Sequence, residues 1–147
     1  MIASAVFASC LLLVVAVSCV GPTVGLDGGR LGDCPSSPNC VCSEQDPDAA
    51  AYIAPFAVPE GVEPRAAFAR LAGIVEAEAT LETREDGYIH AVYKTRILRF
   101  RDDFEARLDS EGKLIHVRSA SRLGSSDFGV NRKRVERLRL LFESEAH

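Results

Sequence analysis

The sequence has no charged side chain before Asp27, so its first 26 residues form one uncharged segment. The stretch from Ala5 to Val17 is apolar and has the length of the hydrophobic centre of a signal peptide. A buried core helix is a poor explanation at an extreme N-terminus that is followed by GPTVGLDGG. A cytoplasmic protein does not need such a segment, and we therefore expect the protein to be exported.

The uncharged segment contains AVSC, Ala16 to Cys19, which resembles the lipobox at which bacterial signal peptidase cuts before a cysteine that becomes acylated. Three alternatives stay open: an acylated Cys19, an uncleaved membrane-spanning anchor, because 26 uncharged residues are long enough to span, or a plain secretory signal. We expect residues 1–19 to be this signal or anchor, residues 20–33 to be a glycine-rich linker, and residues 34–147 to be a single domain. The expected location is the cell envelope, with the membrane as partner.

The sequence also lacks the cysteine and histidine patterns of metal and redox sites. Cys34, Cys40 and Cys42 are spaced C-x5-C and C-x-C, and the three histidines of the chain are scattered. Zinc sites use pairs such as C-x2-C, and thioredoxin-like chemistry uses C-x-x-C at a helix start, so we expect no metal and no cofactor. Export favours a Cys34–Cys40 disulfide that closes a tight loop, with Cys42 left free or replacing one partner. So short a ring stabilises the fold by roughly 2 kcal/mol.

Internal repeats and heptads are absent, and the hydrophobic pattern changes once along the chain. From Pro64 the spacing of apolar residues predicts a helix. Period-two alternation then predicts strands, with hairpin turns at 85–87 and 110–112, before a last helix over about 130–143. This order predicts an α+β fold: an antiparallel sheet of about four strands with two helices on one face and an N-terminal disulfide-pinned loop.

Two stretches, CPSSPNCVCS (34–43) and VRSASRLGSSDFGVNRKRVERLR (117–139), resemble the bacterial domain-of-unknown-function family 1499. The resemblance extends over residues 33 to 142, including YIHAVYKTRILRFRDDFEARLD between the two stretches. Members of the family often show serine where Cys42 stands, which supports the pairing of Cys34 with Cys40. The resemblance implies an exported context and no particular activity.

Basic charge is concentrated near the C-terminus. Between Lys113 and Arg139 eight basic residues stand against two acidic ones, although the whole chain carries −4. Cations in the first turn of the last helix oppose the helix dipole, so a negative partner is expected. That partner is either Asp102, Asp103 and Glu105 of the chain itself or a small bound anion. The expected ligand-binding residues are Arg118, Ser119, Ser121, Arg122, Asp127, Asn131 and Arg134.

The basic segment and its candidate residues are compatible with three classes of function. The first is a non-catalytic envelope module that binds a small anionic ligand, and the second is a hydrolase with a Ser/His/Asp site in the same region. GSSDF at 124–128 lacks the second glycine of the nucleophile elbow G-x-S-x-G, which weakens the hydrolase hypothesis, and no catalytic residue is assigned. The third is a structural envelope protein without a ligand. Nucleic acid is not an expected partner, because the protein is acidic overall and exported.

Overall fold

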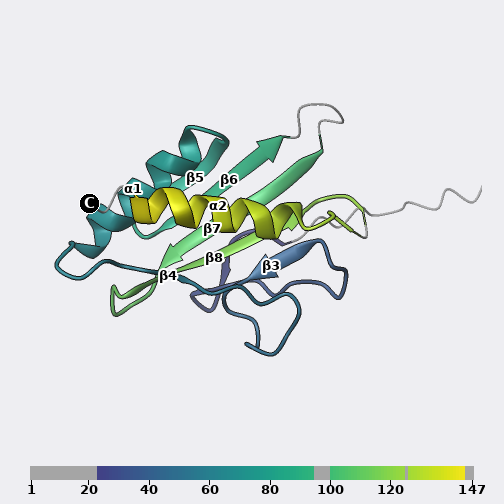
Figure 1. The fold of residues 1–147 in the computed structure, drawn as a ribbon, viewed down its shortest axis with the longest axis horizontal. Helices are drawn as coiled ribbons and strands as arrows, with labels where there is room; N and C mark the ends of the chain where they lie inside the picture. Colours follow the sequence, from purple (N-terminus) through teal and green to yellow (C-terminus); the bar gives the residue numbers. More distant parts are fainter. Residues whose placement is uncertain (1–22, 95–99, 125, 145–147) are drawn as a thin grey trace, which may run out of the picture.

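The computed structural model describes residues 23–94, 100–124 and 126–144. The signal or anchor predicted over residues 1–19, including Cys19, lies outside these ranges. Within them no helix is long and apolar enough to cross a membrane. The chain has the predicted α+β fold, with one large antiparallel sheet and two helices (Figure 1).

The large sheet has six strands rather than the predicted four, in the order β3–β8–β7–β6–β5, with β4 also paired to β8. Its strands are β3 (Cys40–Cys42), β4 (Phe56–Ala57), β5 (Thr80–Glu85), β6 (Tyr88–Lys94), β7 (Arg101–Leu108) and β8 (Leu114–Ser121). The four long strands are the predicted ones, and the turns after β5 and β7 fall at the predicted positions. The two additional strands have three and two residues and pair with opposite ends of β8. They are too short to show an alternating pattern in the sequence. They are strands because their backbones pair with the edge of β8.

Both helices pack on one face of the sheet, as predicted. The first helix, α1 (Pro64–Glu76), begins with Pro64 in its first turn, and the Glu63 carboxylate accepts the Ala66 N–H at 2.7 Å. The second, α2 (Val130–Ser144), lies beside α1. The hydrophobic core lies between these helices and the sheet, and includes the buried side chains of Phe56, Leu71, Ile89, Phe104, Val117, Leu138 and Phe142. We call this face of the sheet the helix side.

The opposite face, which we call the loop side, is covered by the chain before β3. Its hairpin pairs β1 (Leu26–Asp27) with β2 (Arg30–Leu31). The sequence predicts a linker over 20–33, whereas from residue 23 the structure packs this segment on the sheet. Leu31 is buried beside Cys42 and Tyr88, and the Gly25 N–H donates to Oε1 of Glu105 at 2.8 Å. The attachment depends on buried polar contacts with distant strands, which a glycine-rich composition does not reveal.

Candidate functional site

The seven predicted ligand-binding residues lie on both sides of the sheet. Strand alternation turns Arg118 and Arg122 to the loop side, where each contacts an acidic residue of β7. Ser119 points to the helix side, where it meets Asn131 and Arg134 of α2. Arg118 and Arg122 therefore share one face of the sheet, and the sheet separates both from Arg134.

Arg118 and Glu105 form a buried ion pair in the middle of the loop side. Arg118 is 1% exposed and Glu105 is fully buried, and Nη1 of Arg118 donates to Oε2 of Glu105 at 2.9 Å. The other oxygen of Glu105 accepts from the hydroxyl of Tyr88 and from the N–H of Gly25, both at 2.8 Å. A carboxylate with these three donors is well satisfied, as a buried charge must be. The Nε of Arg118 has no hydrogen-bond partner among the described residues.

Arg122 forms the second pair, at the edge of the loop side. Its guanidinium donates twice to Asp103, from Nε at 2.9 Å and from Nη2 at 2.7 Å. His90 Nε2 lies 2.7 Å from the same carboxylate. Burial would raise the pKa of Asp103, but the hydrogen bonds from His90 and Arg122 outweigh it and hold the pKa below its usual value. Asp103 is therefore ionised at neutral pH and supplies the negative charge that Arg122 needs.

Asn131 is the centre of the helix-side cluster. It is fully buried, and its Oδ1 accepts from the Ser119 hydroxyl at 2.6 Å and from Nη1 of Arg134 at 2.5 Å. The other end of the Arg134 guanidinium donates to Asp102 at 2.5 Å. All three predicted arginines thus have one carboxylate partner each: Glu105, Asp103 and Asp102.

Asp127 caps the start of α2. Its carboxylate accepts the N–H groups of Gly129 and Asn131, both at 2.8 Å. Burial raises the pKa of Asp127, and these donors more than reverse the effect, so the pKa lies below its usual value. An ionised Asp127 at the N-terminus of α2 also compensates for the cations of the first helical turn, which interact unfavourably with the helix dipole.

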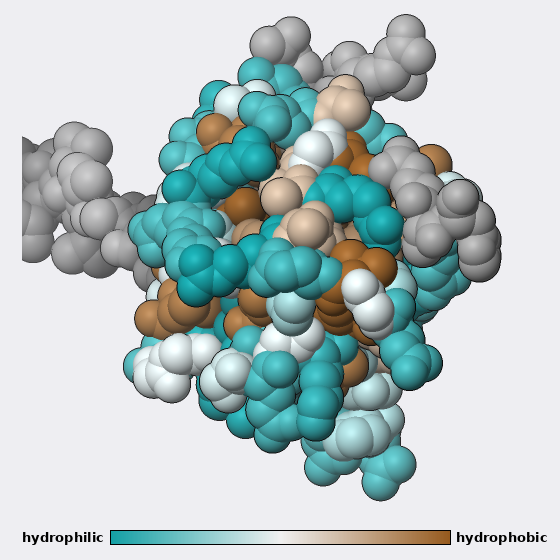
Figure 2. Space-filling model, turned by 90° about the vertical axis from the view of Figure 1, so that its left-hand side faces the viewer, coloured by the Kyte–Doolittle hydropathy of each residue, from teal (hydrophilic) through white to brown (hydrophobic). Residues whose placement is uncertain are grey.

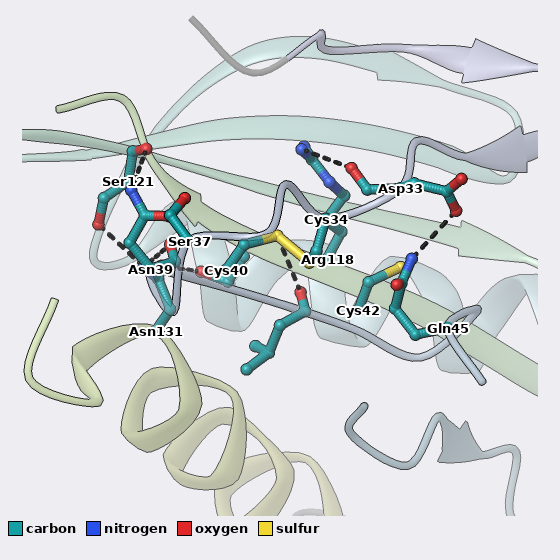
Figure 3. Close-up of a disulfide and its surroundings, with 12 residues drawn as sticks. Asp33, Cys34, Ser37, Asn39, Cys40, Cys42, Gln45, Arg118, Ser121 and Asn131 are labelled. Atoms are coloured by element: carbon teal, nitrogen blue, oxygen red, sulfur yellow. Dashed lines mark hydrogen bonds between the residues drawn. A yellow bond between two sulfur atoms is a disulfide. The ribbon is translucent and has the colours of Figure 1, made fainter. Parts of the chain in front are cut away.

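The two family-like stretches contact one another through Asn39, the residue before Cys40 (Figure 3). Its side chain donates to the carbonyl oxygen of Gly124 at 2.7 Å, and its own carbonyl accepts from Asn131 Nδ2 at 3.0 Å. The disulfide joins Cys34 to Cys40, as predicted. The disulfide loop, residues 34–40, is thereby fastened to residues 122–129. We call residues 122–129 the Arg-rich loop, because they connect the arginine-bearing end of β8 to the arginines of α2. Sequence reasoning did not single out Asn39, although its place inside the quoted motif was a usable signal.

Cys42 is the free cysteine of the described residues, and it is fully buried. Cys34 packs against the small apolar cluster that contains Cys42. Burial raises the pKa of the Cys42 thiol, although a hydrogen bond from the backbone N–H of Glu44 partly offsets this effect. The thiol is therefore protonated and shielded from solvent at neutral pH.

The sheet separates Ser119 from His90 and His116, which argues against a hydrolase site built from them. The Ser119 hydroxyl is held by Asn131 and Arg134 on the helix side, whereas His90 and His116 contact loop-side residues. A Ser–His contact is formed by Ser43, whose Oγ lies 3.2 Å from Nδ1 of His116. Ser43 is buried, and its hydroxyl accepts a hydrogen bond from the Val117 N–H. These contacts give the hydroxyl a structural role.

Two hollows adjoin the Arg-rich loop. A polar hollow of about 420 Å³ lies between the disulfide loop and the end of β8, and its lining includes Thr23, Cys34, Arg118, Arg122 and Gly124. An apolar hollow of about 320 Å³ lies on the other side of the loop and is lined in part by Phe100, Leu123, Phe128 and Val130. The two hollows share Ser121 and Gly124, so both open at the same end of the molecule.

The fold and these contacts define a small α+β domain in which a disulfide loop is fastened to an arginine-rich helix start. The chain belongs to the family described as protein of unknown function DUF1499, whose model matches residues 30–142. No curated protein and no solved structure matches the chain.

Proposed function

We propose that this protein is a non-catalytic domain of the cell envelope, exported and held to a membrane by an acylated Cys19. The observation that carries the proposal is the Cys34–Cys40 disulfide, placed at the point where the two family-like stretches meet. Disulfides persist outside the cytoplasm and are rare inside it. The uncharged N-terminal segment and the AVSC tetrapeptide support the same location.

The non-catalytic part of the proposal is supported by how the charged and hydroxyl groups of the Arg-rich region are used. Arg118, Arg122 and Arg134 each pair with a carboxylate of β7, and Ser119 is bound between two side chains of α2. A catalytic nucleophile needs a base within hydrogen-bond reach and a path to substrate. These groups instead hold α2 and the N-terminal segment on the sheet.

Replacement of Cys19 tests the anchor. Cys19→Ser should move the full chain from the membrane fraction to the soluble envelope fraction, because acylation supplies the membrane affinity. The measurement is fractionation of exporting cells together with mass spectrometry of the mature N-terminus. Cys10→Ser is the matched control and should leave the protein in the membrane. Because Cys19 is also the residue before which the peptidase would cut, a retained Cys19→Ser protein is judged against wild type. A wild-type N-terminus at an acylated Cys19 supports the lipid anchor, whereas an intact wild-type N-terminus would establish a spanning anchor.

A second candidate function is the binding of a small anion, such as a phosphate or carboxylate, in the polar hollow. The observation that favours it is the pair of guanidiniums in the lining: the Arg122 side chain is 34% exposed, and the Nε of Arg118 lacks a hydrogen-bond partner in the described part of the chain. Asp103 accepts two hydrogen bonds from Arg122, whereas Glu105 accepts one from Arg118. A ligand would therefore need to share Arg122 with Asp103.

A thermal-shift series with phosphate, carboxylates and glycerophosphate tests the anion site. If the hollow binds anions, they should raise the melting temperature of wild type and leave that of Arg122→Ala unchanged. Arg137→Ala removes an exposed arginine that pairs with Glu78 and serves as the control, which should keep the wild-type shift. Loss of the Arg122–Asp103 pair should itself cost about 1 to 2 kcal/mol, because Arg122 is partly solvated and His90 still contacts the buried Asp103 carboxylate. Absence of any anion-dependent shift in wild type would remove this second function.

A further inference from the structure

Large apolar side chains are exposed around the Arg-rich loop. Phe128 is 88% exposed, Leu123 is 58% exposed and Val130 is 41% exposed. Together with Phe100 they line the apolar hollow, at the end of the molecule where the loop runs into α2 (Figure 1). We call Leu123, Phe128 and Val130 the apolar rim.

Phe128 also has a backbone conformation that suits its position poorly. Its φ of 53° lies in the left-handed region, where a bulky side chain is strained, and Phe128 is the non-glycine residue with positive φ in the described ranges. Its ring adds nothing to the core, because it projects into solvent. Strain that is kept at an exposed residue without a gain in packing points to a role outside the fold.

The chain reaches this same end of the molecule from its N-terminus. Thr23, the first described residue, lines the polar hollow together with Gly124 of the Arg-rich loop. Cys19 is four residues before Thr23 in the sequence, so a fully extended connection measures about 14 Å at most. An acyl chain on Cys19 would therefore hold the apolar rim close to the bilayer surface.

The other end of the molecule has a different surface. Figure 2 shows that end, with its hydrophobic residues scattered among hydrophilic ones. A hollow there has a net acidic lining, in which Arg65 and Arg107 are outnumbered by Glu63, Glu85, Asp86, Asp109 and Glu111. Leu140, 68% exposed, lies ten residues after Val130 in α2, or about 15 Å along the helix. An acidic end of this kind is repelled by anionic lipids, which favours the apolar rim as the end that faces the membrane.

We propose that the apolar rim is a membrane-docking surface, which inserts Phe128 and Leu123 among the lipid headgroups and upper acyl chains. The inference rests on the proposed anchor at Cys19, because the anchor brings this end of the domain to the bilayer. Docking fixes the orientation of the domain, with the acidic end turned away from the membrane. It also covers apolar surface that the described fold leaves in water.

The absence of tryptophan from the chain allows a direct test. Phe128→Trp places a single indole on the apolar rim, and Leu140→Trp places one at the far end of α2 as the matched control. The full acylated chain is reconstituted into vesicles of phosphatidylcholine and phosphatidylglycerol and recovered by flotation. Lipids brominated along the acyl chain should quench most of the Phe128→Trp fluorescence and blue-shift its emission, and should leave the Leu140→Trp fluorescence nearly unchanged.

Flotation and quenching report separate parts of the proposal. If the protein floats but neither indole is quenched, the docking proposal is wrong and the membrane anchor is still supported. The apolar rim would then be a contact surface for another protein. A blue shift of Phe128→Trp that depends on protein concentration and not on lipid would assign the rim to a second copy of the chain. Protein that does not float overturns the anchor, and docking with it. A Phe128→Ser, Leu123→Ser double variant that stays folded should float as wild type does but lose protection of the Arg-rich loop from added protease.

Discussion

Arg118→Met is expected to destabilise the domain by about 3 to 5 kcal/mol, because it leaves the Glu105 carboxylate buried without its cation. Glu105 would keep the hydrogen bonds from Tyr88 and Gly25. Both donors are neutral, however, so they would not balance the charge of the fully buried carboxylate. Methionine fills most of the volume of the arginine stem, so the loss reports the charge rather than a cavity. Urea denaturation at neutral pH, followed by circular dichroism, measures the change in the free energy of unfolding.

Arg122→Met is the matched control, since Arg122 directly follows the strand of Arg118 and lies on the same side of the sheet, but its side chain is 34% exposed. It should cost less, about 1 to 2 kcal/mol, because water can reach the place of Arg122 and His90 still contacts the buried Asp103 carboxylate. The double variant Arg118→Met, Glu105→Gln should recover part of the loss, because it removes the buried charge itself. Equal costs for Arg118→Met and Arg122→Met would contradict the assignment of Glu105 as a buried, ionised anchor.

Asn131→Ala is expected to cost about 3 kcal/mol and to loosen the start of α2. The amide donates to the carbonyl of Asn39 at 3.0 Å, to the hydroxyl of Ser121 at 2.9 Å and to the carboxylate of Asp127 at 2.7 Å. Its removal leaves buried acceptors unpaired, which costs more than the average value of a hydrogen bond. Alanine has the higher helix propensity, so the local preference acts in the opposite direction.

Lys133→Ala is the control for Asn131→Ala, because it changes an exposed residue in the same turn of α2. It should leave the free energy of unfolding within about 0.5 kcal/mol of wild type. Hydrogen exchange should show faster amide exchange at the start of α2 and near Asn39 in Asn131→Ala alone. Unchanged exchange near Asn39 would mean that the pairing of β3 with β8, and not Asn131, holds this part of the disulfide loop in place.

The elements that could be predicted from the sequence are those with a local signal. Pro64 and the apolar stripe after it located α1, and the glycines at positions 87 and 112 located the two hairpin turns. The period-two alternation also holds in β7, where the Phe104 ring lies in the core and the Glu105 carboxylate lies on the other side. In each case the residues that determine the element are neighbours in the chain.

What could not be predicted depends on which distant segment covers each face. Charges such as Glu105 and Asp103 look like solvent-facing residues by their alternation, and they are buried because residues 23–46 cover that side of the sheet. The position of α2 likewise determines that Arg134 meets Asp102 on the helix side, away from Arg118 and Arg122. The carboxylates proposed from the sequence as internal partners are the ones the structure pairs, although their separation by the sheet was not foreseen.

The buried thiol of Cys42 bears on how the disulfide is kept. Thiol–disulfide exchange needs a thiolate that can reach a sulfur of the bond, and Cys42 lies two residues from Cys40 and packs near Cys34. Once β3 has paired with β8, burial keeps this sulfur protonated and away from solvent oxidants. The folded domain therefore protects its own cross-link from reshuffling. A wrong disulfide can therefore form only before the exported chain has folded, while Cys34, Cys40 and Cys42 can all pair with one another.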